Sequence, residues 1–178
     1  MSWLAADHPR PDAPLAIVRH TADMGVLTDY FSAPSDESTA SALDRVGGPG
    51  QPAAGPSPLP PFDTFQAKGL DPYVIIGKLE AALTGQDYRA ITAGTQYGRM
   101  VAKRGAQGPW VTKVNSPLQA ALSLAGSERL ARALAEWSQA EELGDASPEE
   151  MTWVLEGLSA LARRATAKGE HLYCWVCL

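Results

Sequence analysis

The end of the chain holds the side chains whose types and spacing come closest to a chemical motif. Cys174 and Cys177 form a Cys-x-x-Cys pair, and His171 precedes it by three residues. Such a pair serves redox chemistry when it lies at a helix N-terminus, which lowers the thiol pKa. It serves zinc binding when a turn brings both sulfurs together with further ligands. Redox chemistry and zinc binding are therefore the first two hypotheses for this segment.

The residues around the two cysteines favour a third hypothesis, in which both are packed in a strand. Aromatic, β-branched and other apolar residues run from Leu172 to Leu178 after Gly169, and the run is too short to span a membrane. In a strand, residues three apart lie on opposite faces with α-carbons about 10 Å apart, beyond the ~7 Å limit for a disulfide. We predict a buried strand covered on both faces, with no metal and no cofactor. Zinc binding and redox chemistry remain alternatives.

Acid–base candidates are scattered along the chain. The carboxylates that could include a working pair are Asp29, Asp63, Asp71, Glu80, Asp87, Glu141 and Glu142. Asp71 is explained as a helix N-cap, and the last two are adjacent on a helix and point apart. The chain also lacks the GxSxG, GxxxxGK[ST] and HExxH motifs. We therefore assign no catalytic residue, although an unfamiliar enzyme stays open.

Composition limits the class of protein and of partner. A length of 178 residues with 45% apolar content suits one domain, and a formal charge of −5 disfavours a general polyanion binder. Arg99, Lys103 and Arg104 form a local basic cluster that we interpret as a solvated loop, so no nucleic acid partner is expected. Two cysteines, no long apolar stretch and no signal peptide predict a cytoplasmic protein without a membrane partner.

The pattern of apolar residues and breakers predicts a loose arm over residues 1–23 and a single α+β domain over 24–178, with a Pro/Gly-rich connector at 47–61. Strands are expected near 26–31, 62–68, 109–114 and 172–178, and helices near 37–46, 72–84, 116–125, 127–143 and 148–168. The glycine-interrupted segment 86–108 is expected to be mobile or to face a partner. The sum is a small, mostly antiparallel sheet with the C-terminal strand inside, packed by four to five helices.

Local sequence signals mark the helix ends most clearly. Ser147 followed by Pro148 and Glu150 predicts a capping box, and Gly169 predicts a left-handed stop for the same helix. Asp71 and Pro72 predict the start of an earlier helix. Gly77 inside that helix costs about 1 kcal/mol relative to alanine, so a close packing contact is expected there.

Several short blocks of the chain resemble a family of small uncharacterised proteins of actinobacteria. The blocks are Leu27-Thr-Asp-Tyr-Phe31, Lys68-Gly-Leu-Asp-Pro72, Ile76-Gly-Lys-Leu79, Gly108-Pro-Trp-Val111 and Leu172-Tyr-Cys-Trp-Val-Cys-Leu178. The resemblance covers most of residues 25–178. It implies a shared fold and a cytoplasmic bacterial setting, and it transfers no activity and no catalytic residue.

The absence of a catalytic motif, the acidic charge and the aromatic residues favour a non-enzymatic protein-binding module. Its concrete form is an immunity-type protein that neutralises a toxin, with a basic protein as partner. The binding candidates are Tyr30, Lys68, Trp110, Trp153 and His171. One alternative is a small enzyme with a pocket near Tyr30, Lys68 and His171. The other is a structural or scaffold subunit that self-associates and docks through its connector and arm.

Overall fold

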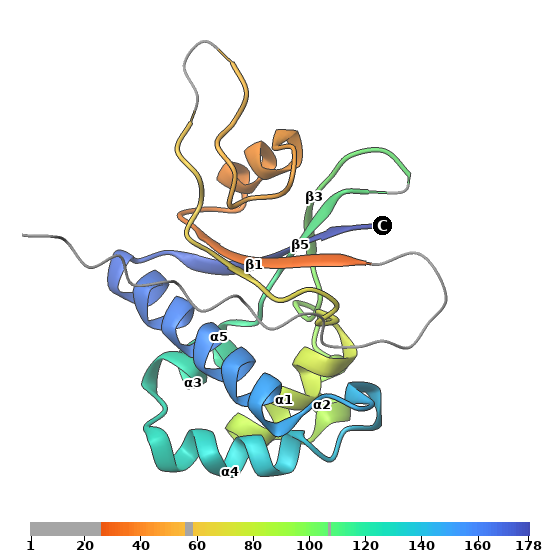
Figure 1. Ribbon diagram of the computed structural model, residues 1–178, viewed down its shortest axis with the longest axis vertical. Coiled ribbons are helices and arrows are strands. Elements are labelled where there is room, and N and C mark those ends of the chain that lie inside the picture. The colour runs from red at the N-terminus through yellow and green to blue at the C-terminus, as the bar shows by residue number, and fades with distance from the viewer. Residues whose placement is uncertain (1–25, 56–58, 107) are drawn as a thin grey trace, which may run out of the picture.

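A five-stranded antiparallel sheet forms the centre of the computed structural model, which describes residues 26–55, 59–106 and 108–178. The strand order is β2-β1-β5-β4-β3 (Figure 1). The strands are β1 (Leu27–Ala33), β2 (Thr64–Gln66), β3 (Met100–Lys103), β4 (Trp110–Lys113) and β5 (His171–Cys177). The prediction that the last strand lies inside the sheet is confirmed, because β5 pairs with β1 on one side and with β4 on the other.

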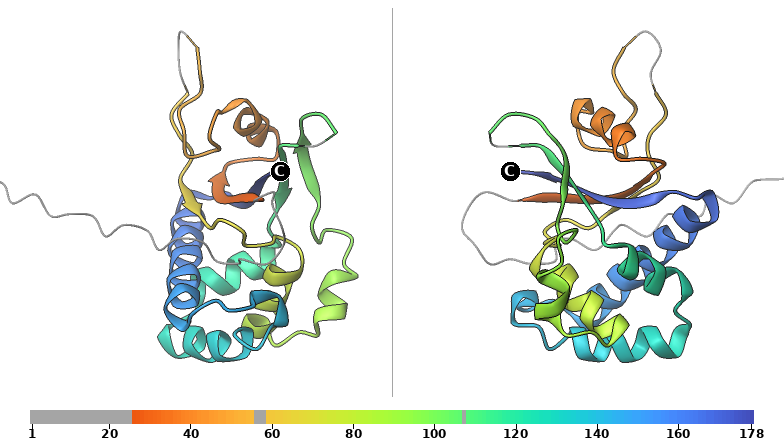
Figure 2. Two further views of the ribbon diagram at one scale, coloured as in Figure 1. Left: turned by 45° about the vertical axis from the view of Figure 1, so that its right-hand side comes forward. Right: turned by 180° about the vertical axis from the view of Figure 1, so that it is seen from behind.

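Two layers cover the sheet. The α-helices within the described ranges are α1 (Val74–Thr84), α2 (Tyr88–Thr92), α3 (Ser116–Leu124), α4 (Ser127–Trp137) and α5 (Pro148–Lys168). Two 3₁₀ helices, η1 (Glu37–Asp44) and η2 (Glu141–Leu143), complete the set. The α-helices lie together on one side of the sheet, while η1 lies on the other side against β3 and β4 (Figures 1 and 2). The predicted α+β fold is therefore confirmed.

The two faces of β5 belong to two different cores, as its alternating pattern predicts. Leu172, Cys174 and Val176 point into the large core under the α-helices. Tyr173 and Trp175 point into a smaller core beneath η1. Both faces of β5 are thus buried against apolar side chains. This explains why residues 172–178 are hydrophobic at nearly every position.

Cys174 and Cys177 lie on opposite faces of the sheet. Cys174 is buried and Cys177 is half-buried, and both are free thiols. Burial raises the pKa of the Cys174 thiol, so the thiolate that nucleophilic or redox chemistry needs is disfavoured at this residue. The described ranges contain no group of three His, Cys, Asp or Glu side chains that could hold a metal ion. None of the helices in those ranges has the length and apolar character needed to cross a bilayer.

The predicted signals at both ends of α5 correspond to caps, whereas α1 begins at Val74 with Tyr73, not the predicted Asp71, as its N-cap. Ser147 Oγ accepts a hydrogen bond from the Glu150 backbone N–H at 3.1 Å, and the Ser147 backbone N–H donates one to Glu150 Oε2 at 2.8 Å. Gly169 ends α5 with φ of 69°. Asp71 Oδ1 accepts from the backbone N–H of Tyr73 at 2.9 Å, just before α1 begins. These contacts are local, which is why sequence could predict them.

Three local predictions differ from the structure. The segment 86–106, part of the stretch expected to be mobile or to face a partner, contains α2 and β3, because Asp87 caps α2 and β3 pairs with β4 at the sheet edge. The helix predicted to reach residue 143 ends at Trp137. The helix predicted near residues 37–46 is a 3₁₀ helix that ends at Asp44, and its buried side chains Thr39 and Ala42 are three residues apart, as the tighter 3₁₀ period requires.

Two helical glycines make room for aromatic rings. A Cβ atom at Gly77 would lie 2.1 Å from Tyr97 Oη, so the predicted close contact is present. A Cβ atom at Gly157 would lie 2.2 Å from Phe65 Cε2. Phe65 in turn lies against Trp153, with ring centroids 4.8 Å apart. Gly157 therefore sets how closely β2 approaches α5.

Replacement of Gly157 by alanine should destabilise the protein although alanine is the better helix former. The added Cβ forces the Phe65 ring away from Trp153, and overpacking of this kind costs about 1–3 kcal/mol, against a helix gain of about 1 kcal/mol. Urea unfolding of Gly157→Ala measures the loss. In a Phe65→Ala background the same change should become stabilising, because the clash is gone. Destabilisation that persists in that background would contradict the explanation.

Candidate functional site

The structure does not bring Tyr30, Lys68 and His171 into one pocket. Tyr30 is 1% exposed, and its hydroxyl donates to the Leu70 carbonyl at 3.0 Å inside the large core. Lys68 is exposed two residues after Gln66, the partner of Asp29, and so lies toward the end of β1 where Leu27 pairs with Cys177. His171 is the first residue of β5, four residues before Trp175, which is about 13 Å along a strand. The register of β1 against β5 places Lys68 and His171 at opposite ends.

Trp110 lies on β4 as a residue of the core edge. It is opposite Val176 of β5 and packs half-buried against the large core. Its indole N–H is buried and has no hydrogen-bond partner among the residues that the structure describes. Trp110 therefore contributes mainly to packing.

Trp153 is the binding candidate with the clearest surface setting. It is half-buried on α5, and its ring packs on Phe65 at an interplanar angle of 50°. A shallow hollow with a volume of about 330 Å³ opens beside it. The hollow is lined by Pro148, Glu149, Thr152, Trp153 and Glu156, and we call it the Trp153 hollow.

Two carboxylates flank the indole in this hollow. Glu149 is one helical turn before Trp153 and Glu156 is one turn after it, so all three side chains share a face of α5. Neither glutamate forms a salt bridge within the described ranges. An aromatic face between two unpaired carboxylates attracts a cation through both its ring quadrupole and its charges. The helical spacing of Glu149, Trp153 and Glu156 was a signal that the sequence analysis did not use.

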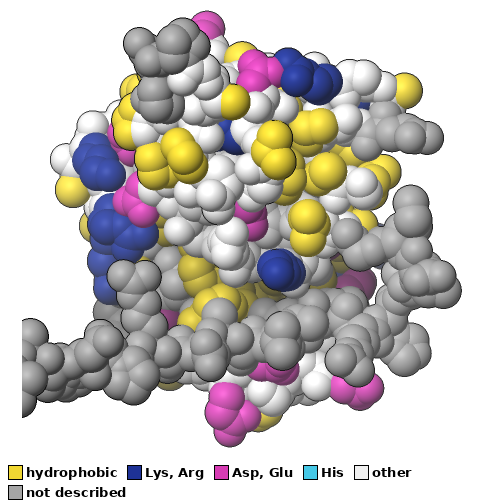
Figure 3. All heavy atoms as spheres, turned by 45° about the horizontal axis from the view of Figure 1, so that its top comes forward, with side chains coloured by type: hydrophobic (Ala, Val, Ile, Leu, Met, Phe, Trp, Pro, Cys, Tyr) yellow, Lys and Arg dark blue, Asp and Glu magenta, His cyan; other side chains and the backbone are white. Residues whose placement is uncertain are grey.

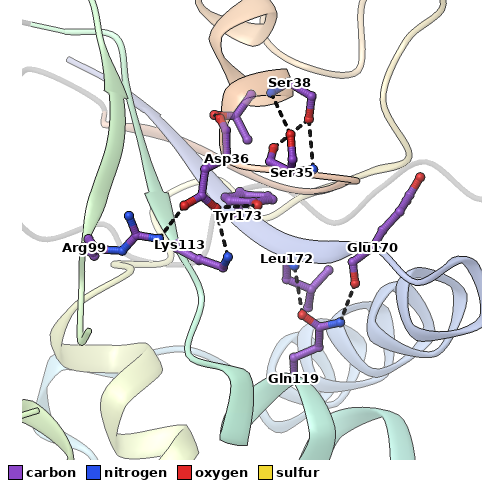
Figure 4. A network of polar contacts seen from close by, with 10 residues as sticks. Ser35, Asp36, Ser38, Arg99, Lys113, Gln119, Glu170, Leu172 and Tyr173 are labelled. Carbon is purple, nitrogen blue, oxygen red and sulfur yellow. Dashed lines mark hydrogen bonds and ion pairs between the residues drawn. The ribbon is translucent and has the colours of Figure 1, made fainter. Parts of the chain in front are cut away.

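A second polar cluster holds η1 on the sheet (Figure 4). The carboxylate of Asp36, just before η1, accepts hydrogen bonds from Arg99, from Lys113 Nζ at 2.9 Å and from the Tyr173 hydroxyl at 2.8 Å. Burial alone would raise the pKa of Asp36, but the hydrogen bonds from these donors outweigh it and hold the pKa well below its usual range. One carboxylate thus binds two cations and a hydroxyl group, and these contacts tie the start of η1 to β4 and β5. The cluster also accounts for Arg99, which the sequence analysis placed in a basic loop.

Gln119 makes a comparable link between α3 and the start of β5 (Figure 4). Its side-chain amide donates to the Glu170 carbonyl at 2.9 Å and accepts from the Leu172 N–H at 2.9 Å. The amide thereby satisfies the backbone of β5 where the chain leaves α5. This contact fixes the position of Glu170 beside β1.

Asp29 is the buried carboxyl group that stands out electrostatically. It is 5% exposed on β1, and burial raises its pKa to about 6, opposed by the charge of Lys68. Gly48 packs directly on it, since a Cβ atom there would lie 2.7 Å from Oδ2. The described part of the chain supplies no hydrogen bond to the carboxylate that offsets this burial. Because Asp29 is covered, its expected effect is on stability rather than on contact with a ligand.

The chain was compared with protein-family models, with curated proteins and with solved structures, and none of the three comparisons found a match.

Proposed function

We propose that the protein is a non-enzymatic protein-binding module that takes a lysine or arginine side chain of a basic partner in the Trp153 hollow. The observation that carries the proposal is the placement of Glu149 and Glu156, which form no salt bridge within the described ranges, on either side of a half-exposed indole. A rigid aromatic anchor with complementary charge is typical of residues that dominate binding at protein interfaces.

The anchor is held in place before any partner binds. Phe65 packs on Trp153 and is itself seated on Gly157, so the indole has little rotamer freedom to lose. A cation over such a ring gains about 0.5–2 kcal/mol. The positive end of the α5 dipole opposes a cation near Glu149 by about 0.3–1 kcal/mol, which the two carboxylates offset. One side chain therefore binds weakly, and a partner must add contact area around it.

An immunity-type protein that neutralises a toxin is the concrete form of this function. The formal charge of −5 favours rapid encounter with a basic toxin, and the aromatic anchor slows its release. In this setting the protein acts in a bacterial cytoplasm, as the resemblance to actinobacterial proteins implies.

The side-chain specificity can be tested by NMR on the indole N–H of Trp153, identified by its loss in Trp153→Phe. Nα-acetyl-lysinamide should shift this signal in a saturable way, whereas Nα-acetyl-norleucinamide, which lacks the charge, should not. Replacing both Glu149 and Glu156 by glutamine should weaken the lysine response at least about threefold. The matched control replaces Glu128 and Glu136 on α4, both exposed, and should change nothing.

Equal responses to the two probes would contradict the proposal, as would an unchanged response in the Glu149 and Glu156 variant. A partner captured from the native host and encoded by a neighbouring gene provides the second stage. Its affinity should fall in the same variant, fall with rising salt, and stay unchanged in the α4 control.

A further inference from the structure

An open cavity lies between η1, the end of the connector and the junction of α5 with β5. Its volume is about 710 Å³, within the range of cavities that hold small ligands. We call it the η1 cavity. Its apolar wall includes Pro60, Pro61 and Phe62. Figure 3 views the molecule from the side that carries η1 and the connector, where hydrophobic side chains gather with a few charged ones between them.

Arg45 brings a buried positive charge to this cavity. The residue is 4% exposed, and its guanidinium carbon lies 4.6 Å from the centroid of the Phe62 ring. One guanidinium nitrogen donates to the Gln51 carbonyl, but Nε has no partner among the described residues. No carboxylate of the described ranges forms an ion pair with Arg45. A buried cation without a counter-ion is costly, and burial accordingly lowers the pKa of Arg45.

Two carboxylates of the cavity wall are also without a cation in the described ranges. They belong to Glu37, at the start of η1, and to Glu170, whose Oε2 accepts a hydrogen bond from Ser32 at 2.5 Å. The other two carboxylates of the wall lie in ion pairs. Asp44 pairs with Arg104, and Asp63 pairs with both Arg164 and Lys168, which is the second cation of the wall. Within the described ranges, Arg45, Glu37 and Glu170 are thus the charged side chains of the wall that form no ion pair.

We propose that the η1 cavity binds a small zwitterion of the class of a free dipeptide, with its carboxylate at Arg45 and its ammonium group at Glu37 and Glu170. A guanidinium matches the planar geometry of a carboxylate better than any other side chain does. A simple anion would meet repulsion from both glutamates, and a simple cation would meet repulsion from Arg45. Phe62 and the two prolines supply an apolar surface for the ligand's side chain.

Three matched probes test the two charges separately. They are the dipeptide alanyl-phenylalanine with free termini, its C-terminal amide and its N-acetyl derivative. Saturation-transfer NMR and thermal unfolding of the full chain should show that the free dipeptide binds and raises the melting temperature. The amide, which lacks the carboxylate, and the acetyl derivative, which lacks the ammonium group, should each bind at least about fivefold more weakly.

Variants assign these charges to residues. Glu37→Gln should weaken binding of the free dipeptide and leave binding of the acetyl derivative unchanged. Glu128→Gln on α4 should change the binding of neither probe. Arg45→Gln, which lacks the positive charge, should remove the preference of the protein for the free carboxylate over the amide. Because Arg45 also packs on Phe62, Glu37→Gln keeps the test decisive if the arginine variant does not fold.

The proposed site is contradicted if the free dipeptide does not bind at about 10 mM, or if all three probes bind with the same affinity. The readouts need no protein partner and do not involve Trp153. Failure here therefore leaves the proposed protein-binding function untouched, and failure of that function leaves this site untouched.

Discussion

Removal of the last four residues, 175–178, should yield a chain that does not fold. Three of these residues, Trp175, Val176 and Cys177, form the end of β5, which pairs with β1 and β4 at once. Trp175 and Val176 are 4% and 2% exposed, one in each core. Loss of a buried tryptophan costs about 3–5 kcal/mol and loss of a buried valine about 1.5–3 kcal/mol. Together with the lost pairing, this approaches the whole stability of a domain.

The measurement is soluble yield together with near-UV circular dichroism and urea unfolding. Removal of Leu178 alone is the control, because this side chain is 57% exposed and lies beyond β5. The variant that lacks only Leu178 should have nearly the same free energy of unfolding as the full chain. A cooperative unfolding transition in the four-residue deletion would show that β5 is not the central support of the sheet.

Replacement of Asp29 by asparagine should stabilise the protein at neutral pH. The folded-state pKa of about 6 lies above the ordinary value of 3.8, so folding favours the protonated carboxyl group and disfavours the charged one. A difference of this size corresponds to at most about 3 kcal/mol. Asparagine keeps the shape and never ionises, so it removes this cost.

The sign of the pH dependence follows from the raised pKa. The contribution of Asp29 to the free energy of unfolding is most favourable below the unfolded-state pKa of 3.8. It falls as the pH rises toward about 6 and is constant above that pH. Urea unfolding of the wild type and of Asp29→Asn should therefore give stabilities that diverge between about pH 4 and about pH 6, with the variant more stable above that range. Asp145→Asn, at an exposed position, serves as control. A variant that is less stable than the wild type above pH 6 would refute the cost assigned to Asp29.

The fold was largely predictable where its causes are local. The capping box at Ser147 and Glu150 depends on contacts within one helical turn. The inner position of β5 follows from apolar residues on both of its faces. By contrast, β3 contains few strand-forming signals between its flanking glycines, and it forms because β4 provides backbone partners.

The candidate site was predictable only in part. Trp153 was recognisable from its place beside the apolar stripe of its helix, and Glu149 and Glu156 lie at helical spacing from it. The packing of Trp153 on Phe65, which comes from a strand distant in the sequence, was not predictable from the sequence. The hypothesis that Tyr30, Lys68 and His171 line one pocket depended on strand ends, and the register of β1 against β5 separates them.

The sequence by itself determined the α+β class, the ends of α5 and the central place of β5, because neighbouring residues carry those signals. Only the tertiary structure decided that Asp29 is buried under Gly48 and that Arg45, Glu37 and Glu170 line the same cavity. The physical reason is that burial and charge pairing depend on segments far apart in the chain. No local period or propensity records which of those segments meet.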